Sequence, residues 1–161
     1  MRGPRTLRCL QHPSMQLVLL LLALVAGVAL TVQVGLNAQL RTWTIDPAIA
    51  TLVSFLVGSA TLLLYALATR APLPAASRMA TAPWWVWTGG MLGAGYVLAT
   101  IVLAPRLGPG VLFGAVVAGQ MAAAVVVEHF GWLGFQAHPV NAARLAGVAM
   151  IVGGVVLLRR F

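Results

Sequence analysis

Few side chains in this 161-residue sequence could carry acid–base, nucleophilic or metal chemistry. A single cysteine, Cys9, can form neither an intrachain disulfide nor a cysteine cluster for zinc. The histidines are too scattered for a metal-ligand motif: His12, His129 and His138. Paired carboxylates, a Ser/His/Asp set, a phosphate-binding glycine loop and an HExxH helix are not recognisable either. We therefore expect no metal site, no cofactor and no enzymatic activity.

The two acidic residues, Asp46 and Glu128, differ in their surroundings. Glu128 abuts a long apolar run, where a charge is costly unless it is paired or reaches water. Three interpretations stay open for it: proton or cation coupling, an interfacial ion pair with Arg144, and a solvated helix end. Asp46 lies in an expected loop near Arg41, and we assign it no function.

The composition is that of a membrane protein. Apolar residues make up 61% of the chain and charged residues only 7%, against about 25% charged in soluble domains. The formal net charge of +8 comes from ten arginines that punctuate apolar runs. Nucleic-acid binding needs a basic stripe along one face, so we expect no nucleic-acid partner. The arginines are typical of charges that flank membrane spans.

Five apolar runs approach the roughly 20 residues that a helix needs to cross a bilayer. They cover residues 15–36, 48–69, 84–104, 111–127 and 142–158. Continuous runs favour helices over the alternating strands of a barrel, so the predicted fold class is all-α, an integral membrane bundle of five transmembrane helices. Residues 1–14 are predicted to be a disordered basic tail, or to precede the native start, and residues 159–161 form a short basic C-terminus. The first 30 residues also fit a secretory signal, but the apolar run continues to Leu36.

Arginines are divided almost evenly between the two sides of such a bundle. One side collects Arg2, Arg5, Arg8, Arg70, Arg78 and Arg144, and the other Arg41, Arg106, Arg159 and Arg160. The division is six to four, or three to four without the tail. Because an excess of loop arginines sets orientation, this weak bias leaves dual topology open.

Polar and aromatic side chains recur at helical spacing within the spans. Residues 51, 54, 58, 61 and 65, for example, lie within about 80° of one another around one helix. We predict that a substrate pathway is lined by Gln33, Asn37, Ser54, Tyr65, Trp85, Tyr96 and Gln120. The alternatives are bonds from hydroxyls to their own helix, aromatic packing against glycine, and interfacial anchoring by tryptophan.

Small residues at four-residue intervals suit close helix packing, because apolar burial does not drive association inside a bilayer. We assign structural roles to Gly27, Gly58, Gly89, Gly93, Gly114, Arg144, Gly147 and Gly154.

Five ordered blocks of sequence carry a family resemblance. They are GVALTVQVGLNAQL at 27–40, ATLVSFLVG at 50–58, PWWVWTGGMLGAG at 83–95, GQMAAAVVVEHFG at 119–131 and RLAGVAMIVGG at 144–154. Over residues 15–158 the chain resembles the YdcZ-like five-helix branch of the drug/metabolite transporter (DMT) superfamily.

This resemblance implies a multi-pass protein of the bacterial inner membrane, equivalent to one half of a ten-helix DMT or EamA-like transporter. It implies an antiparallel homodimer or a heterodimer with a paralogue, in which four helices line a cavity and the fifth is peripheral. Gln33, Asn37, Ser54 and Gln120 match recurring polar positions of the branch, and Arg144 its arginine. The first-helix glutamate of the small multidrug relatives is missing, so proton antiport through that position is not carried over.

The leading hypothesis is a small secondary transporter that works by alternating access. Its substrate is unknown, either a small metabolite or an amphipathic or cationic compound. The rival is a non-transporting membrane subunit that stabilises or localises a larger complex.

Overall fold

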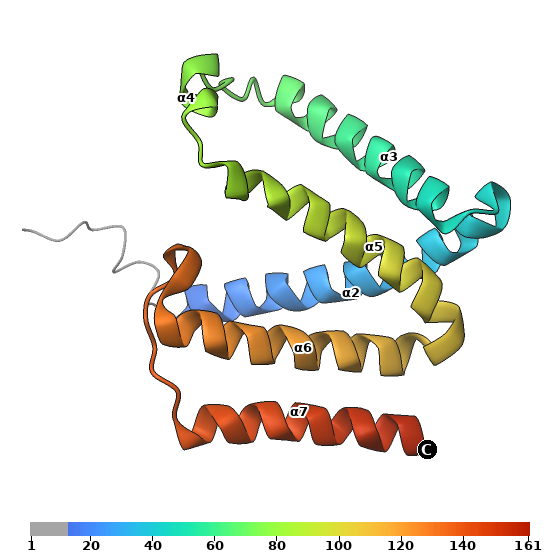
Figure 1. Cartoon of the computed structure of the whole chain (residues 1–161), viewed down its shortest axis with the longest axis vertical. Helices are drawn as coiled ribbons and strands as arrows, with labels where there is room; N and C mark the ends of the chain where they lie inside the picture. Colours follow the sequence, from blue (N-terminus) through green and yellow to red (C-terminus); the bar gives the residue numbers. More distant parts are fainter. Residues whose placement is uncertain (1–12) are drawn as a thin grey trace, which may run out of the picture.

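The computed structural model describes residues 13–161, which form five long helices joined by short segments (Figure 1). The long helices are α2 (Pro13–Thr44), α3 (Pro47–Ala68), α5 (Thr88–Leu107), α6 (Pro109–Phe130) and α7 (Ala142–Arg160). The short elements are α4 (Ala76–Ala80) and two 3₁₀ turns, η1 (Trp84–Trp87) and η2 (Trp132–Gly134). No strand occurs in the described part of the chain. The predicted all-α fold class is confirmed.

The outer surface of the bundle is apolar. Each of the five long helices, with η1 counted into α5, is long and apolar enough to cross a membrane. Large side chains on them are open to the surroundings, as at Leu20 and Leu64, which are 64% and 68% exposed. Such a surface is stable in contact with lipid and not with water. The bilayer is therefore a partner of this chain.

The first helix is longer than expected. It continues through the polar stretch after Leu36, which the sequence analysis assigned to a loop, and ends at Thr44. Ile45 turns the chain with a positive φ of 67°. Asp46 then caps α3: its Oδ1 accepts hydrogen bonds from the backbone N–H groups of Ala48 at 2.7 Å and Ile49 at 3.2 Å. Asp46 thus has a structural role that the sequence analysis did not assign. Of the predicted tail, residues 1–12 lie outside the described part.

The turn between α5 and α6 is shorter than the gap between the predicted runs 84–104 and 111–127. Pro105 is still helical, and only Gly108 separates the two helices. Gly108 has a φ of 75°, which glycine adopts without a steric penalty. Pro109 follows at the first position of α6, where its missing N–H costs no helical hydrogen bond.

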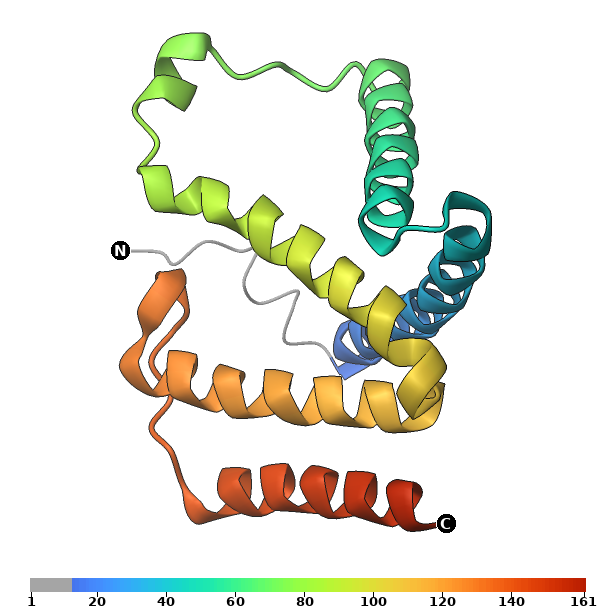
Figure 2. The ribbon, with the colours of Figure 1, turned by 45° about the vertical axis from the view of Figure 1, so that its right-hand side comes forward.

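Helices α3 and α5 pack against their neighbours at one end of the bundle and diverge from α6 at the other, whereas α6 and α7 run side by side (Figures 1 and 2). We call the end where α2 meets α3, and α5 meets α6, the packed end, and the opposite end the open end. Figures 1 and 2 show α3 and α5 rising away from α6 toward the open end. The buried side chains of the described residues lie on the packed half of their helices or at mid-helix: Val34, Asn37, Ala50, Thr51, Val97, Thr100, Ile101 and Leu112. The core therefore holds one end of the bundle together.

Helix α7 packs mainly on α6, at the edge of the molecule (Figure 1). A Cβ atom placed on Gly114 of α6 would lie 2.8 Å from Cγ2 of Val155 on α7, so the missing side chain permits this approach. At Gly93 the nearest atom is Cζ of Phe55, at 3.9 Å. Beside the other predicted structural glycines nothing lies within 4 Å: Gly27, Gly58, Gly89, Gly147 and Gly154. Their packing role stays a prediction.

Candidate functional site

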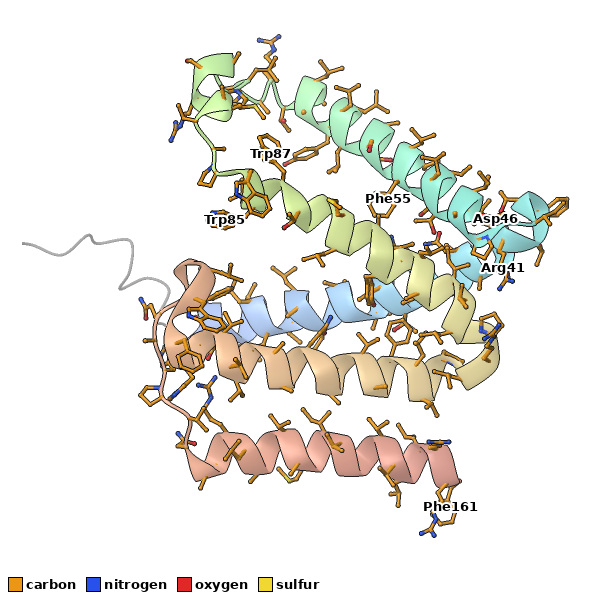
Figure 3. All side chains as sticks on the ribbon, viewed as in Figure 1. Arg41, Asp46, Phe55, Trp85, Trp87 and Phe161 are labelled. Atoms are coloured by element: carbon orange, nitrogen blue, oxygen red, sulfur yellow. The ribbon has the colours of Figure 1, made fainter. Side chains whose placement is uncertain are left out.

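A small hollow lies between α2, α3 and α5. Its volume is about 220 Å³, and it is lined by Gln33, Ser54, Phe55, Gly58, Ser59, Leu62 and Val97. The ring of Phe55 points from α3 toward α5 and forms one wall (Figure 3). Two residues of the predicted pathway, Gln33 and Ser54, thus face the same space from different helices.

Asn37 lies one helical turn from Gln33 on α2. Its side chain is only 5% exposed, and its amide nitrogen Nδ2 has no hydrogen-bond partner among residues 13–161. The hydroxyl of Tyr96 on α5 is also buried without a partner in this part of the chain. Leaving a buried polar group unpaired costs about 1–3 kcal/mol, so such groups are rare unless a ligand or another chain satisfies them.

Buried hydroxyls of the same region are satisfied within their own helices. Thr51 donates to the carbonyl oxygen of Pro47 and Thr100 to that of Val97, each at 2.8 Å. The unpaired atoms of Asn37 and Tyr96 are therefore not a general property of this core. They mark two positions where this chain offers hydrogen bonds that it does not use itself.

Three other predicted pathway residues do not reach this hollow. Tyr65 on α3 is 67% exposed, and Gln120 on α6 is exposed as well. Trp85 belongs to η1, before α5 begins at Thr88, and it does not line the hollow. Figure 3 shows Trp85 and Trp87 on different sides of the start of α5. A role for these side chains in a pathway stays a prediction.

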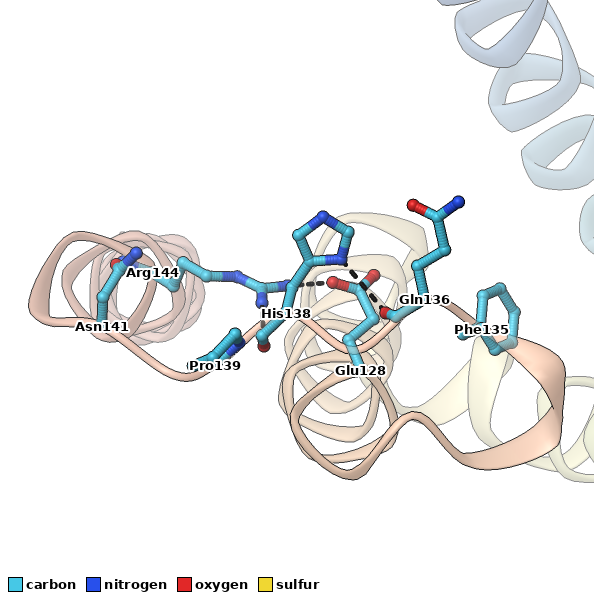
Figure 4. A pocket seen from close by; sticks show the side chains of 7 residues that line it. All are labelled: Glu128, Phe135, Gln136, His138, Pro139, Asn141 and Arg144. Carbon is cyan, nitrogen blue, oxygen red and sulfur yellow. Dashed lines mark hydrogen bonds and ion pairs between the residues drawn. The ribbon is translucent and has the colours of Figure 1, made fainter. Parts of the chain in front are cut away.

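A second polar cluster lies at the open end, where α6 is followed by α7. A guanidinium nitrogen of Arg144, Nη2, donates to Oε2 of Glu128, and Nη1 donates to the carbonyl oxygen of His138 at 3.0 Å (Figure 4). Both charged side chains are partly exposed, Arg144 at 26% and Glu128 at 32%. Of the three interpretations of Glu128, the structure shows the ion pair with Arg144.

The loop between α6 and α7 is fixed by further hydrogen bonds. The backbone N–H of His138 donates to the carbonyl oxygen of Glu128 at 2.8 Å, and that of Val140 donates to Nδ1 of His129 at 3.2 Å. Oδ1 of Asn141 accepts from the backbone N–H of Arg144 at 2.9 Å and so caps α7. These contacts orient Arg144 toward the end of α6.

The residues of this cluster line a cleft of about 660 Å³ that is open to the surroundings. Its lining consists of Glu128, Phe135, Gln136, His138, Pro139, Asn141 and Arg144 (Figure 4). The sequence analysis did not select His138, Gln136 or Asn141. The role of Asn141 could have been predicted from the sequence, because an asparagine before an apolar helical run is a typical N-cap. The contact of the His138 carbonyl oxygen with Arg144 depends on the path of the loop between α6 and α7, and residue spacing does not predict that path. Within residues 13–161 no group of side chains is suited to hold a metal ion.

Five apolar helices, each long enough to cross a bilayer, define a multi-pass membrane protein. A family model described as "Putative inner membrane exporter, YdcZ" matches residues 18–157, nearly the whole chain. The chain belongs to this YdcZ family, and the resemblance seen in the sequence is confirmed. Membership makes it a multi-pass protein of the inner membrane in an exporter family, not in a class of enzymes. The same comparisons found no matching curated protein and no matching solved structure.

Proposed function

We propose that this protein is a secondary transporter that moves a small polar solute across the inner membrane by alternating access. The observation that carries the proposal is the buried, unpaired amide of Asn37, one turn from the hollow that contains Gln33 and Ser54. A solute with a hydrogen-bond acceptor would satisfy this amide, and the hydroxyl of Tyr96 offers a further bond. Membership of an exporter family supports the same conclusion.

The charges of the chain favour an uncharged solute over a cation. A cation inside the bilayer needs a carboxylate partner, and the chain has only two acidic residues. Asp46 caps α3 at the packed end, and Glu128 pairs with Arg144 at the open end. Neither is free beside the hollow. Glu128 remains our candidate for proton or cation coupling, a role in which Arg144 would have to release it.

A second chain would complete the site. The hollow holds about 220 Å³, below the roughly 300–1,000 Å³ of typical ligand pockets. We propose an antiparallel homodimer, or a heterodimer with a paralogue, as the transporting unit. The arginines of residues 13–161 support insertion in either orientation, because they are divided almost evenly between the two ends of the bundle. The open end has Arg70, Arg78 and Arg144, and the packed end has Arg41, Arg106, Arg159 and Arg160.

Transport into proteoliposomes tests the proposal. Purified protein would be assayed with radiolabelled glycerol, ribose and N-acetylalanine amide as uncharged solutes, and with tetraphenylphosphonium as a lipophilic cation. We expect saturable uptake of an uncharged solute, reduced at least about tenfold by Asn37→Ala or Gln33→Ala through loss of substrate hydrogen bonds. Thr61→Ala is the matched control, because Thr61 is exposed and bonds only to its own helix.

Two outcomes would contradict the proposal. Uptake of the cation alone would contradict the uncharged substrate class. If no probe moves and the Gln33 variant changes only stability, the alternative of a non-transporting subunit of a larger complex gains support. Cysteine crosslinking in native membranes, combined with orientation reporters at the C-terminus, tests the antiparallel pair separately.

A further inference from the structure

The polar cleft at the open end continues into an apolar groove between α6 and α7. The groove holds about 300 Å³ and is lined by Met121, Ala124, Val125, Glu128, Arg144, Gly147, Val148 and Ile151. Glu128 and Arg144 line both spaces and form the boundary between them. The two together make one amphipathic site, charged at the end of the helices and apolar along them. We call it the α6–α7 site.

The charged groups of this site have unused bonding capacity. Arg144 has five N–H donors, of which two are directed at Glu128 and at the carbonyl oxygen of His138. No hydrogen bond from residues 13–161 reaches the second carboxylate oxygen of Glu128, Oε1. A ligand could therefore bind an anionic group to Arg144 and a cationic group to Glu128 while the ion pair stays intact.

Aromatic side chains place this site at the depth of lipid headgroups. Phe130 is the last residue of α6, Trp132 and Phe135 follow it, and each is more than half exposed. The rings of Phe130 and Trp132 stack with centroids 4.8 Å apart. Trp132 is the amphipathic ring of the three, and tryptophan concentrates where hydrocarbon meets headgroups. Glu128 lies one helical turn before it and pairs with Arg144, so both charges lie at this level.

We propose that the α6–α7 site binds phosphatidylethanolamine. The lipid phosphate lies on Arg144, its ammonium group on Glu128, and one acyl chain in the groove. The paired charges favour a zwitterion, because an anionic lipid would meet the carboxylate and gain no partner for it. The groove favours a lipid over free phosphate, since Met121, Val125 and Ile151 offer apolar walls and nothing fills the space beside Gly147.

Native mass spectrometry of the delipidated full chain tests this proposal. The protein would be titrated with phosphatidylethanolamine, with phosphatidylglycerol of the same acyl chains, and with inorganic phosphate. We expect phosphatidylethanolamine to bind about tenfold more tightly than phosphatidylglycerol, the effect of one charge-assisted contact. Glu128→Gln should remove this preference, and Arg144→Gln should weaken the binding of both lipids. Arg78→Gln is the control, because Arg78 lies at the same end, exposed and outside the site.

A further variant keeps the test independent of the ion pair. Gly147→Leu fills the groove without altering Glu128 or Arg144, and it should reduce binding of both lipids about tenfold through loss of the space for the acyl chain. Equal affinity of the wild type for both lipids would overturn the proposal. So would undiminished lipid binding by Gly147→Leu, or displacement of the lipid by inorganic phosphate at a similar concentration.

Discussion

The contact of α6 with α7 at Gly114 allows a quantitative prediction. In the variant Gly114→Ala, the new Cβ would lie 2.8 Å from Cγ2 of Val155, whereas ordinary contacts begin at 3.4 Å. The helices would have to separate locally by roughly 0.6 Å, or Val155 would have to rotate. Rotation is costly because a β-branched side chain in a helix strongly prefers one rotamer.

The expected change in the free energy of unfolding follows from two opposing effects. Overpacking costs about 1–3 kcal/mol. Replacing a helical glycine by alanine gains about 0.5–1 kcal/mol. We therefore expect Gly114→Ala to be less stable than wild type by up to about 2.5 kcal/mol. Gly119→Ala on the same helix should show only the stabilisation from replacing glycine by alanine, because a Cβ atom on Gly119 would meet nothing within 4 Å.

Unfolding in mixed micelles with increasing sodium dodecyl sulfate would measure both variants. The double variant Gly114→Ala with Val155→Ala should recover most of the overpacking cost, because the clashing methyl groups are gone. Coupling between these two substitutions would identify α6–α7 packing as the cause. The reasoning is refuted if Gly114→Ala is at least as stable as Gly119→Ala.

Three further predictions concern single side chains. Asp46→Ala removes the N-cap of α3 and should lower the free energy of unfolding by about 1 kcal/mol. Asp46→Asn should keep most of the stabilisation by the cap, because asparagine is also a good N-cap residue. Equal losses of stability in the two variants would contradict a capping role. His129→Ala leaves the Val140 amide without its acceptor, so hydrogen–deuterium exchange of the α6–α7 loop should accelerate, and unchanged exchange would argue against that bond. Asn37→Leu removes a buried unpaired amide and should stabilise the protein by about 1 kcal/mol while abolishing uptake in proteoliposomes; lower stability would show that the amide is hydrogen-bonded in the folded protein, within the chain or across a dimer.

The sequence predicts the five helices well, because a run of apolar residues of bilayer length has few alternatives to a helix. It predicts their ends less well. The stretch after Leu36 contains asparagine, glutamine and arginine, which resemble a loop at a membrane surface, yet Asn37 is buried in a continuing helix. Polarity alone does not distinguish a residue that leaves the membrane from one that faces a neighbouring helix.

The candidate site was predictable only in part. Helical periodicity places Gln33 and Ser54 on definite faces of their own helices, and these faces do meet. The same periodicity does not show that Tyr65 and Gln120 lie away from the hollow, because the angles at which helices cross depend on packing that residue spacing does not encode. The ion pair of Glu128 with Arg144 was one of three open interpretations, and its geometry is fixed by the folded loop.

The concentration of buried side chains at the packed end has a mechanical consequence. Helix α3 has 22 residues and is therefore about 33 Å long. It is anchored near its first turn, where Ala50 and Thr51 are buried. From that anchor to Ala68 the helix is about 26 Å long, so a tilt of about 10° would carry this far end by about 5 Å. Helix α3 therefore acts as a lever with a short arm at the packed end and a long arm toward the open end, so a small movement at the core becomes a larger one at the opposite membrane face.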